Sequence, residues 1–274
     1  MKDPLWVRSG LIFLTVVFFV VFIFLPLVLV FAEAFKKGWE VYLAAWTEDA
    51  ALKAIELTLI TTGIAVPLNA LFGIAAAWLI TKFSFRGKTF LVSLLDLPFA
   101  VSPVIAGLIF VLLLGSRTPL GSWLGTLGIK VIYSTPGIIL ATIFVTFPFV
   151  VRELIPLMQA QGREEEEAAL TLGARGGQMF WRVTLPNIKW GLLYGMVLCN
   201  ARALGEFGAV SVVSGHIRGE TNTIPLHVEI LYSEYNFTAS FAVASILVFL
   251  ALITLVVKSL LEHQFAKQER GDSF

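Results

Sequence analysis

Three charged side chains fall within otherwise apolar stretches of this 274-residue sequence. Arg202 and Glu206 lie four residues apart, a spacing that places both on one face of a helix, and Asp96 precedes two prolines. An unpaired charge in the hydrocarbon of a membrane costs at least about 2.5–3.5 kcal/mol. We therefore expect Arg202 and Glu206 to pair inside a helix bundle. Two roles stay open: a structural ion pair, or contact of Arg202 with an anionic substrate.

The segment 94–103 combines Asp96 with Pro98 and Pro103. A helix interrupted there exposes backbone carbonyls and amides, which a membrane protein tolerates only inside a bundle or beside water. One interpretation places this break, with Ser102 and Pro103, beside a substrate path. The other interpretation is a proline-kinked helix that Asp96 caps near the cytoplasmic surface.

A polar segment, residues 164–190, separates two long apolar runs and begins with four consecutive Glu residues. Its first part consists of strong helix formers, with acidic residues at the leading end, where the helix dipole favours them. Gly173 and the pair Gly176–Gly177 are expected to break or bend the chain, and an apolar pattern then resumes until Pro186. The pattern predicts two short helices joined by a glycine hinge. The alternative is a solvated loop whose Glu run only aids solubility.

This segment resembles the EAA…G…I-LP signature of permease subunits of bacterial ABC importers, with Val183 in place of the usual Ile. The resemblance implies the type I ABC importer permease fold and a coupling loop, residues 159–190, that inserts into a cleft on a cytoplasmic ATPase subunit. Further stretches are similar to the W-type permease subunits of the sulfate/thiosulfate branch: 147–150, 183–190, 200–209 and 214–221. The residues matching the signature, and so expected to couple to the ATPase, are Glu167, Ala168, Ala169, Gly173, Val183, Leu185 and Pro186.

Composition places the chain in a membrane. Hydrophobic residues make up 57% of it and charged residues only 14%, whereas a soluble domain usually carries about 25% charge. The net charge of +1 gives no basic surface that would favour nucleic acid. The single Cys199 excludes an internal disulfide and is expected to be a small packing residue.

Six apolar runs are long enough to cross a bilayer, which requires about 20 residues each. The sequence therefore predicts an all-α integral membrane protein with six transmembrane helices. Connections that would face the cytoplasm hold 13 of the 20 Lys and Arg residues, against 6 on the outside. Because positive residues stay inside, we expect the N-terminus, the C-terminus and the 164–190 segment to be cytoplasmic. The six runs are 11–32, 57–81, 89–114, 135–151, 191–214 and 239–257.

The expected domain organisation follows from these runs. Residues 1–10 form a cytoplasmic N-terminus and 11–32 a first, peripheral transmembrane helix, which is too long for the 7–15-residue core of a cleaved signal peptide. Residues 33–56 form an external loop. A permease core of five transmembrane helices occupies 57–261, including the coupling loop, and 262–274 form a cytoplasmic tail.

The chain lacks a phosphate-binding Gly-x-x-x-x-Gly-Lys-Ser/Thr loop, so we expect it not to be an enzyme. The expected function is the permease subunit of an ATP-driven importer that moves sulfate or thiosulfate across the bacterial inner membrane by alternating access. One alternative is transport of molybdate or another oxyanion, and another is a single-chain secondary transporter. An intramembrane hydrolase is disfavoured, because all three His residues lie outside the apolar runs.

Partners follow in part from the chain and in part from the resemblance. Six helices are few for a whole pathway, and the resemblance implies a second, homologous permease subunit. It also implies two copies of a cytoplasmic ATPase subunit, which would carry ATP and Mg, and an external sulfate-binding protein. Membrane lipid is the remaining expected partner, with no cofactor on this chain. We expect no metal site, because the spacing of the external His and Glu residues matches no zinc pattern.

Overall fold

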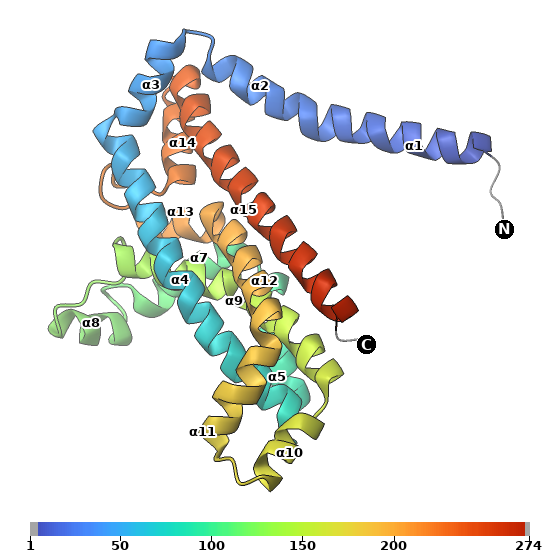
Figure 1. The fold of residues 1–274 in the computed structure, drawn as a ribbon. Helices are drawn as coiled ribbons and strands as arrows, with labels where there is room; N and C mark the ends of the chain where they lie inside the picture. Colours follow the sequence, from blue (N-terminus) through green and yellow to red (C-terminus); the bar gives the residue numbers. More distant parts are fainter. Residues whose placement is uncertain (1–4, 272–274) are drawn as a thin grey trace.

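The computed structural model describes residues 5–271, with side chains for residues 6–261 (Figure 1). The outermost residues of the two expected cytoplasmic ends, 1–4 and 272–274, lie outside this description. Within it the chain forms α-helices and two π-helical turns, and no strand. The elements are α1 (Leu5–Phe19), η1 (Val20–Phe24), α2 (Leu25–Ala34), α3 (Trp39–Thr47), α4 (Asp49–Lys82), α5 (Lys88–Leu95), α6 (Leu97–Ala100), α7 (Pro103–Leu114), α8 (Pro119–Thr126), α9 (Thr135–Gln161), α10 (Glu164–Thr171), α11 (Gly176–Met179), η2 (Phe180–Thr184), α12 (Leu185–Leu204), α13 (Gly208–Ser214), α14 (Ile224–Ser233) and α15 (Phe237–Gly271).

Between four and six segments of the described chain can cross a membrane by length and composition. Four are unbroken helices: Trp6–Ala34, Asp49–Lys82, Thr135–Gln161 and Phe237–Leu261. Two more arise if each bent pair of helices counts as one span. These pairs are α7 with α8, bent by 62°, and Gly176–Leu204 with α13, bent by 55°.

The third span differs from the expected helix over 89–114. The chain there forms α5, α6 and α7, and it leaves helical geometry at Val101, whose ψ angle is 132°. Proline explains the position of the break, because the residue before a proline avoids the helical region: Ser102, which precedes Pro103, has a ψ angle of 136°. The bent span that passes the length test therefore joins α7 to α8.

The fifth span also differs from its expected bounds, 191–214. The helix begins at Gly176 and runs to Leu204, so the expected helix end at Pro186 is wrong. The preceding turn is π-helical, and the amide of Leu185 donates to the carbonyl oxygen of Phe180. A wider turn accommodates proline, which has no N–H and whose ring crowds the carbonyl four residues earlier.

The same device occurs in the first span. There the turn η1 precedes Leu25-Pro26, and the amide of Leu25 donates to the carbonyl oxygen of Val20. Leu25-Pro26, which opens α2, and Leu185-Pro186, which opens α12, thus follow π-helical turns in continuous helices and do not mark helix ends. Figure 1 shows the first of these helices projecting from the body, which it joins beside α15 through α2.

The centre of the bundle is formed by α4, α9 and α12, which approach each other through glycines. A Cβ atom at Gly73 of α4 would lie 2.7 Å from a methyl of Val150 on α9, and one at Gly195 of α12 would lie 3.2 Å from the Cα of Val150. This close packing agrees with the small residues that the sequence places in these runs. Cys199 is buried in the same core, as expected of a packing residue.

Candidate functional site: the coupling loop and the paired helix breaks

The segment after α9 protrudes as α10 and α11 at one end of the molecule (Figure 1). Gly173 ends α10 with a φ angle of +87°, a conformation that favours glycine. The amide of Gly173 donates to the carbonyl of Leu170, and the amide of Ala174 donates to that of Ala169, both at 3.0 Å. These two bonds form a Schellman motif, which satisfies the last carbonyls of the helix. The turn at Gly173 is therefore built into the backbone.

The pair Gly176–Gly177 has a different role from the one expected. These residues form the first turn of α11 and do not bend the chain. The backbone amide of Arg175 donates to the side-chain oxygen of Gln178 at 3.0 Å, which is one half of a capping box. The hinge between α10 and α11 is thus confined to residues 172–175.

A buried ion pair attaches α10 to the rest of the molecule. The ammonium of Lys82, the last residue of α4, lies 3.2 Å from the carboxylate of Glu166, and their side chains are only 8% and 11% exposed. The hydroxyl of Thr184 donates to the other oxygen of Glu166 at 2.7 Å, and Lys82 also donates to the carbonyl of Gly162. We call these residues, Lys82, Gly162, Glu166 and Thr184, the loop clamp.

Sequence reasoning missed the loop clamp. The run of four Glu residues gave no means of choosing Glu166, because the register of α10 against α4 depends on tertiary packing. One available signal was Lys82, the cation that ends the apolar run of α4. If such a cation is buried, it has to pair with an opposite charge, which predicts a carboxylate near the end of that helix.

The outer face of the loop carries apolar groups that no described residue of the chain covers. Leu172 is 89% exposed, and Leu170 and Trp181 are also exposed. A shallow groove of about 350 Å³ lies beside Leu172. Exposed apolar groups gathered at one protruding end are typical of a docking surface. The groove is lined by Ala169, Leu172, Gly173, Ala174, Gln178, Met179, Arg182 and Val183.

The structure divides the expected coupling residues into two groups. Ala169, Gly173 and Val183 line the groove, and Glu167 and Ala168 are exposed on the same helix α10. The other two start α12: Leu185 packs against the central core, and Pro186 follows the π-turn. The signature therefore combines a surface with an internal backbone feature.

Arg202 and Glu206 form the expected ion pair, at 2.6 Å. They do not share one continuous helix, however, because α12 ends at Leu204 and Glu206 lies in the break before α13. The second carboxylate oxygen of Glu206 accepts the backbone N–H of Ala209 at 2.9 Å. Glu206 is 2% exposed, whereas the side chain of Arg202 is 32% exposed. The pair thus bridges the break and leaves about a third of the Arg202 side chain exposed.

The break at Ser102 lies beside the break at Glu206. A Cβ atom at Gly208 would lie 2.9 Å from the Cβ of Pro103, and one at Gly107 would lie 2.7 Å from the carbonyl oxygen of Ala209. The half-helices α7 and α13 consequently pack with glycines at their contact. The four residues expected along a substrate path, Ser102, Pro103, Arg202 and Glu206, are distributed over these two adjoining breaks.

The side chain of Asp96 makes no capping hydrogen bond to a helix, in contrast to one of the two interpretations of this segment. Its carboxylate accepts two hydrogen bonds from the guanidinium of Arg152 on α9, at 2.8 and 3.0 Å. The guanidinium also lies 4.4 Å from the ring centre of Phe99. Asp96 therefore ties the junction of α5 and α6 to α9, through a pair that is about half exposed.

Of the two His residues expected outside the membrane, His216 lies 3.8 Å from the carboxylate of Glu229. His227 of α14 is fully buried, and this burial lowers the pKa of its imidazole, which favours the neutral form. Among residues with described side chains, no three His, Cys, Asp or Glu residues are placed to hold a metal ion.

The sequence matches a family profile over residues 69–269, which include both breaks and the whole loop. The family is described as "Binding-protein-dependent transport system inner membrane component". The chain belongs to this family. Membership, together with the apolar helices, confirms the expected multi-pass membrane protein.

Relatives of this inner membrane component extend along almost the whole chain. The sulfate transport system permease protein CysW of Escherichia coli (strain K12) is 54% identical over 245 residues, covering 89% of this chain and 84% of that protein. The CysW protein of Synechocystis sp. is 50% identical over 258 residues, covering 94% of each chain. The CysT permease protein of Escherichia coli (strain K12) is 34% identical over 257 residues, covering 94% and 93%.

The fold of this inner membrane component occurs in a solved ABC transporter. A chain of a bacterial alginate ABC transporter, crystallised with an alginate-bound periplasmic protein, superposes with a TM-score of 0.75 and covers 94% of this chain and 93% of its own. At 20% identity this likeness concerns the fold alone. The expected type I ABC importer permease fold is confirmed.

Proposed function

We propose that this chain is the permease subunit of an ATP-driven importer that moves sulfate or thiosulfate across the bacterial inner membrane. The assignment of sulfate or thiosulfate as cargo rests on the identity of 50–54% to proteins named as sulfate transport permeases, over most of both chains. Transport of molybdate or another oxyanion stays the nearest alternative. A single-chain secondary transporter is disfavoured, because it would have no use for the exposed apolar surface around Leu172.

The proposed complex contains a second, homologous permease, two cytoplasmic ATPase subunits and an external sulfate-binding protein. The similarity to both CysW and CysT, at 54% and 34% identity, supports two related permeases of distinct kinds. ATP and Mg would bind the ATPase subunits, so this chain would hydrolyse nothing. We place both termini and the coupling loop in the cytoplasm, on the distribution of Lys and Arg.

The geometry offers a direct route from the ATPase to the membrane path. Residues 176–204 form one continuous helix. The second half of the coupling loop, residues 176–184, therefore belongs to the same element as Arg202. At 1.5 Å per residue this helix is about 40 Å long. The loop clamp fastens α10 to the end of α4 and to Thr184 at the base of the same helix. Movement of the loop would therefore displace the break that carries Arg202 and Glu206.

The two adjoining breaks are our candidate for the substrate path. Arg202 lies there, paired with Glu206 at 2.6 Å and with about a third of its side chain exposed. A partly accessible guanidinium would lower the barrier for a dianion, since a charged group is costly at this depth without a partner. Ser102 and Pro103 would form the facing wall.

The experiment is co-purification of the chain with candidate ATPase subunits in detergent. Glu167→Arg reverses an exposed charge on α10, while Glu40→Arg reverses one on α3 and serves as the matched control. We expect the ATPase to be lost with Glu167→Arg and retained with Glu40→Arg. Uptake of labelled sulfate, thiosulfate and molybdate by the intact complex then identifies the cargo. Uptake that persists without any ATPase would contradict the importer.

A further inference from the structure

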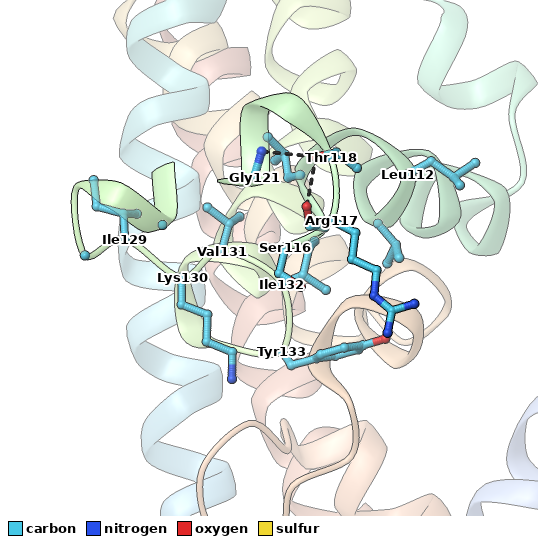
Figure 2. A pocket seen from close by; sticks show the side chains of 15 residues that line it. Leu112, Ser116, Arg117, Thr118, Gly121, Ile129, Lys130, Val131, Ile132 and Tyr133 are labelled. Atoms are coloured by element: carbon cyan, nitrogen blue, oxygen red, sulfur yellow. Dashed lines mark hydrogen bonds between the residues drawn. The ribbon is translucent and has the colours of Figure 1, made fainter. Parts of the chain in front are cut away.

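A pocket of about 530 Å³ lies at the outer end of α7 (Figure 2). Its walls are the last turn of α7, the helix α8 and the segment 128–133. The chain folds back tightly here, because Gly121 contacts the carbonyl of Gly115 so closely that a side chain would not fit. The side-chain hydroxyl of Thr118 stabilises the turn by accepting a hydrogen bond from the backbone N–H of Gly121 at 3.0 Å. The pocket is therefore a built feature of the backbone.

The pocket lies at the opposite end of α9 from the coupling loop. Tyr133 lines it and lies two residues before α9, which ends at Gln161 beside the coupling loop. A helix of 27 residues spans about 40 Å, which exceeds the roughly 30 Å of the hydrocarbon core. The pocket consequently lies near the membrane surface on the other side from the loop.

Two cations give this pocket its charge. Arg117 and Lys130 are the charged residues of the stretch 97–151, which contains no Asp or Glu at all. Figure 2 shows their side chains on either side of Tyr133. In the part of the chain with described side chains, neither forms an ion pair. The pocket thus offers positive charge that no internal carboxylate offsets.

The rest of the lining is mostly apolar and opens onto an apolar face of α7. Leu112 lines the pocket and is 76% exposed. Leu108 and Ile105 lie one and two turns earlier on the same face, and both are about half exposed. Trp123 of α8 is also exposed, as is typical of aromatic residues at the level of lipid headgroups. Cations at one side and an apolar strip at the other fit an amphiphile.

We propose that this pocket binds an anionic glycerophospholipid. Arg117 and Lys130 would hold its phosphodiester, and an acyl chain would lie along the Ile105–Leu108–Leu112 face of α7. A small inorganic dianion fits less well, because it would gain nothing from the apolar walls. A lipid is also available at this depth in every membrane. The pocket is joined to the second break, since the amide of Tyr133 donates to the carbonyl of Val213 in α13 at 2.8 Å.

The test compares two double variants of the full-length chain purified with its partner subunits. Arg117→Gln with Lys130→Gln removes both pocket cations. Lys37→Gln with Lys53→Gln removes two exposed cations from other parts of the chain and is the matched control. Phosphatidylglycerol and phosphatidylcholine are titrated separately onto each delipidated complex, and bound lipid is counted by native mass spectrometry.

We expect phosphatidylglycerol to bind the pocket variant about 30-fold more weakly than the control, since each cation near a membrane surface contributes about 1 kcal/mol. Phosphatidylcholine should show no such difference. Equal binding of phosphatidylglycerol to both variants would overturn the proposal. Displacement of the lipid by millimolar inorganic sulfate would instead assign the pocket to the free dianion. A loss confined to the affinity for the external binding protein, with lipid unchanged, would assign it to protein docking.

Discussion

Two ion pairs of the described chain, Lys82–Glu166 and Arg202–Glu206, differ in what they join. Lys82 and Glu166 lie 84 residues apart, both are nearly inaccessible, and they connect the end of α4 to the coupling loop. Arg202 and Glu206 lie four residues apart and connect α12 to the break that follows it, with Arg202 about one third exposed. The first pair fixes two elements to each other, whereas the second stabilises an irregularity within one span.

This difference bears on what each pair can do in a transport cycle. The side chains of Lys82 and Glu166 are nearly inaccessible, so in the proposed importer the loop clamp would make the loop move together with α4 and α12. The Arg202–Glu206 pair keeps an accessible cation at a break, where a polar group is tolerated only inside protein or beside water. A cation of that kind is available to a passing anion. In the proposed importer, transmission would fall to the first pair and contact with cargo to the second.

Breaking the loop clamp should give the largest loss of stability. Lys82→Met leaves the carboxylate of Glu166 buried without its cation, which typically costs about 3–5 kcal/mol. We expect a marked fall in the thermal unfolding midpoint of the purified chain. The control is Lys82→Met combined with Glu166→Leu, which removes both charges and should recover most of the loss, because a buried ion pair and an apolar pair of similar volume are often comparable in stability. A double variant as unstable as the single one would show that the charges do not form the clamp.

Breaking the Arg202–Glu206 pair should lower the stability less than breaking the loop clamp does, but it should lower transport more. Arg202→Met leaves Glu206 buried, although its carboxylate keeps the amide of Ala209. A buried carboxylate that loses its cation typically costs about 3–5 kcal/mol; because Arg202 is partly exposed and Glu206 keeps the bond to Ala209, we expect a loss near the lower end, about 3 kcal/mol. Uptake of labelled sulfate should fall to background with Arg202→Met and persist in part with Arg202→Lys, which keeps the charge. Normal uptake by Arg202→Met would remove Arg202 from the path.

The contact between the two half-helices offers a smaller and purely steric test. Gly107→Ala places a Cβ atom 2.7 Å from the carbonyl of Ala209, and the expected loss is about 2 kcal/mol, in the middle of the usual range for an overpacked contact. Gly63→Ala in α4 is the control, because a Cβ there meets nothing within 4 Å. Thermal midpoints of the two variants give the comparison. Equal midpoints would show that α7 and α13 are free to separate.

Much of this architecture follows from sequence patterns that act locally. Apolar runs predicted the four unbroken spans, and Asp96 with Pro98 and Pro103 indicated an interrupted span, which the structure contains. The spacing of Arg202 and Glu206 predicted their ion pair correctly. Each of these features depends on neighbouring residues or on the partition of side chains into hydrocarbon, so a single stretch of sequence carries the information.

The features that escaped prediction depend on contacts between distant segments or on backbone detail. Pro186 reads as a helix end, yet one π-helical turn lets the helix continue. The choice of Glu166 among four Glu residues depends on how α10 packs on α4. Glu206 lies beyond the end of its helix because α13 turns by 55° to pack on α7. No local pattern specifies these arrangements.

The outer face of the coupling loop should show the smallest effect on the chain itself. Leu172→Gln changes a side chain that is 89% exposed, so the free energy of unfolding should change by no more than about 0.5 kcal/mol. Retention of the ATPase should nevertheless weaken by roughly 10- to 100-fold, because burying a leucine at an interface contributes about 1.5–3 kcal/mol. Leu172→Met keeps an apolar group of similar volume and should retain the ATPase. If Leu172→Gln kept the ATPase as well as Leu172→Met does, the docking surface would have to lie elsewhere, and the loop clamp would lose its role in transmission.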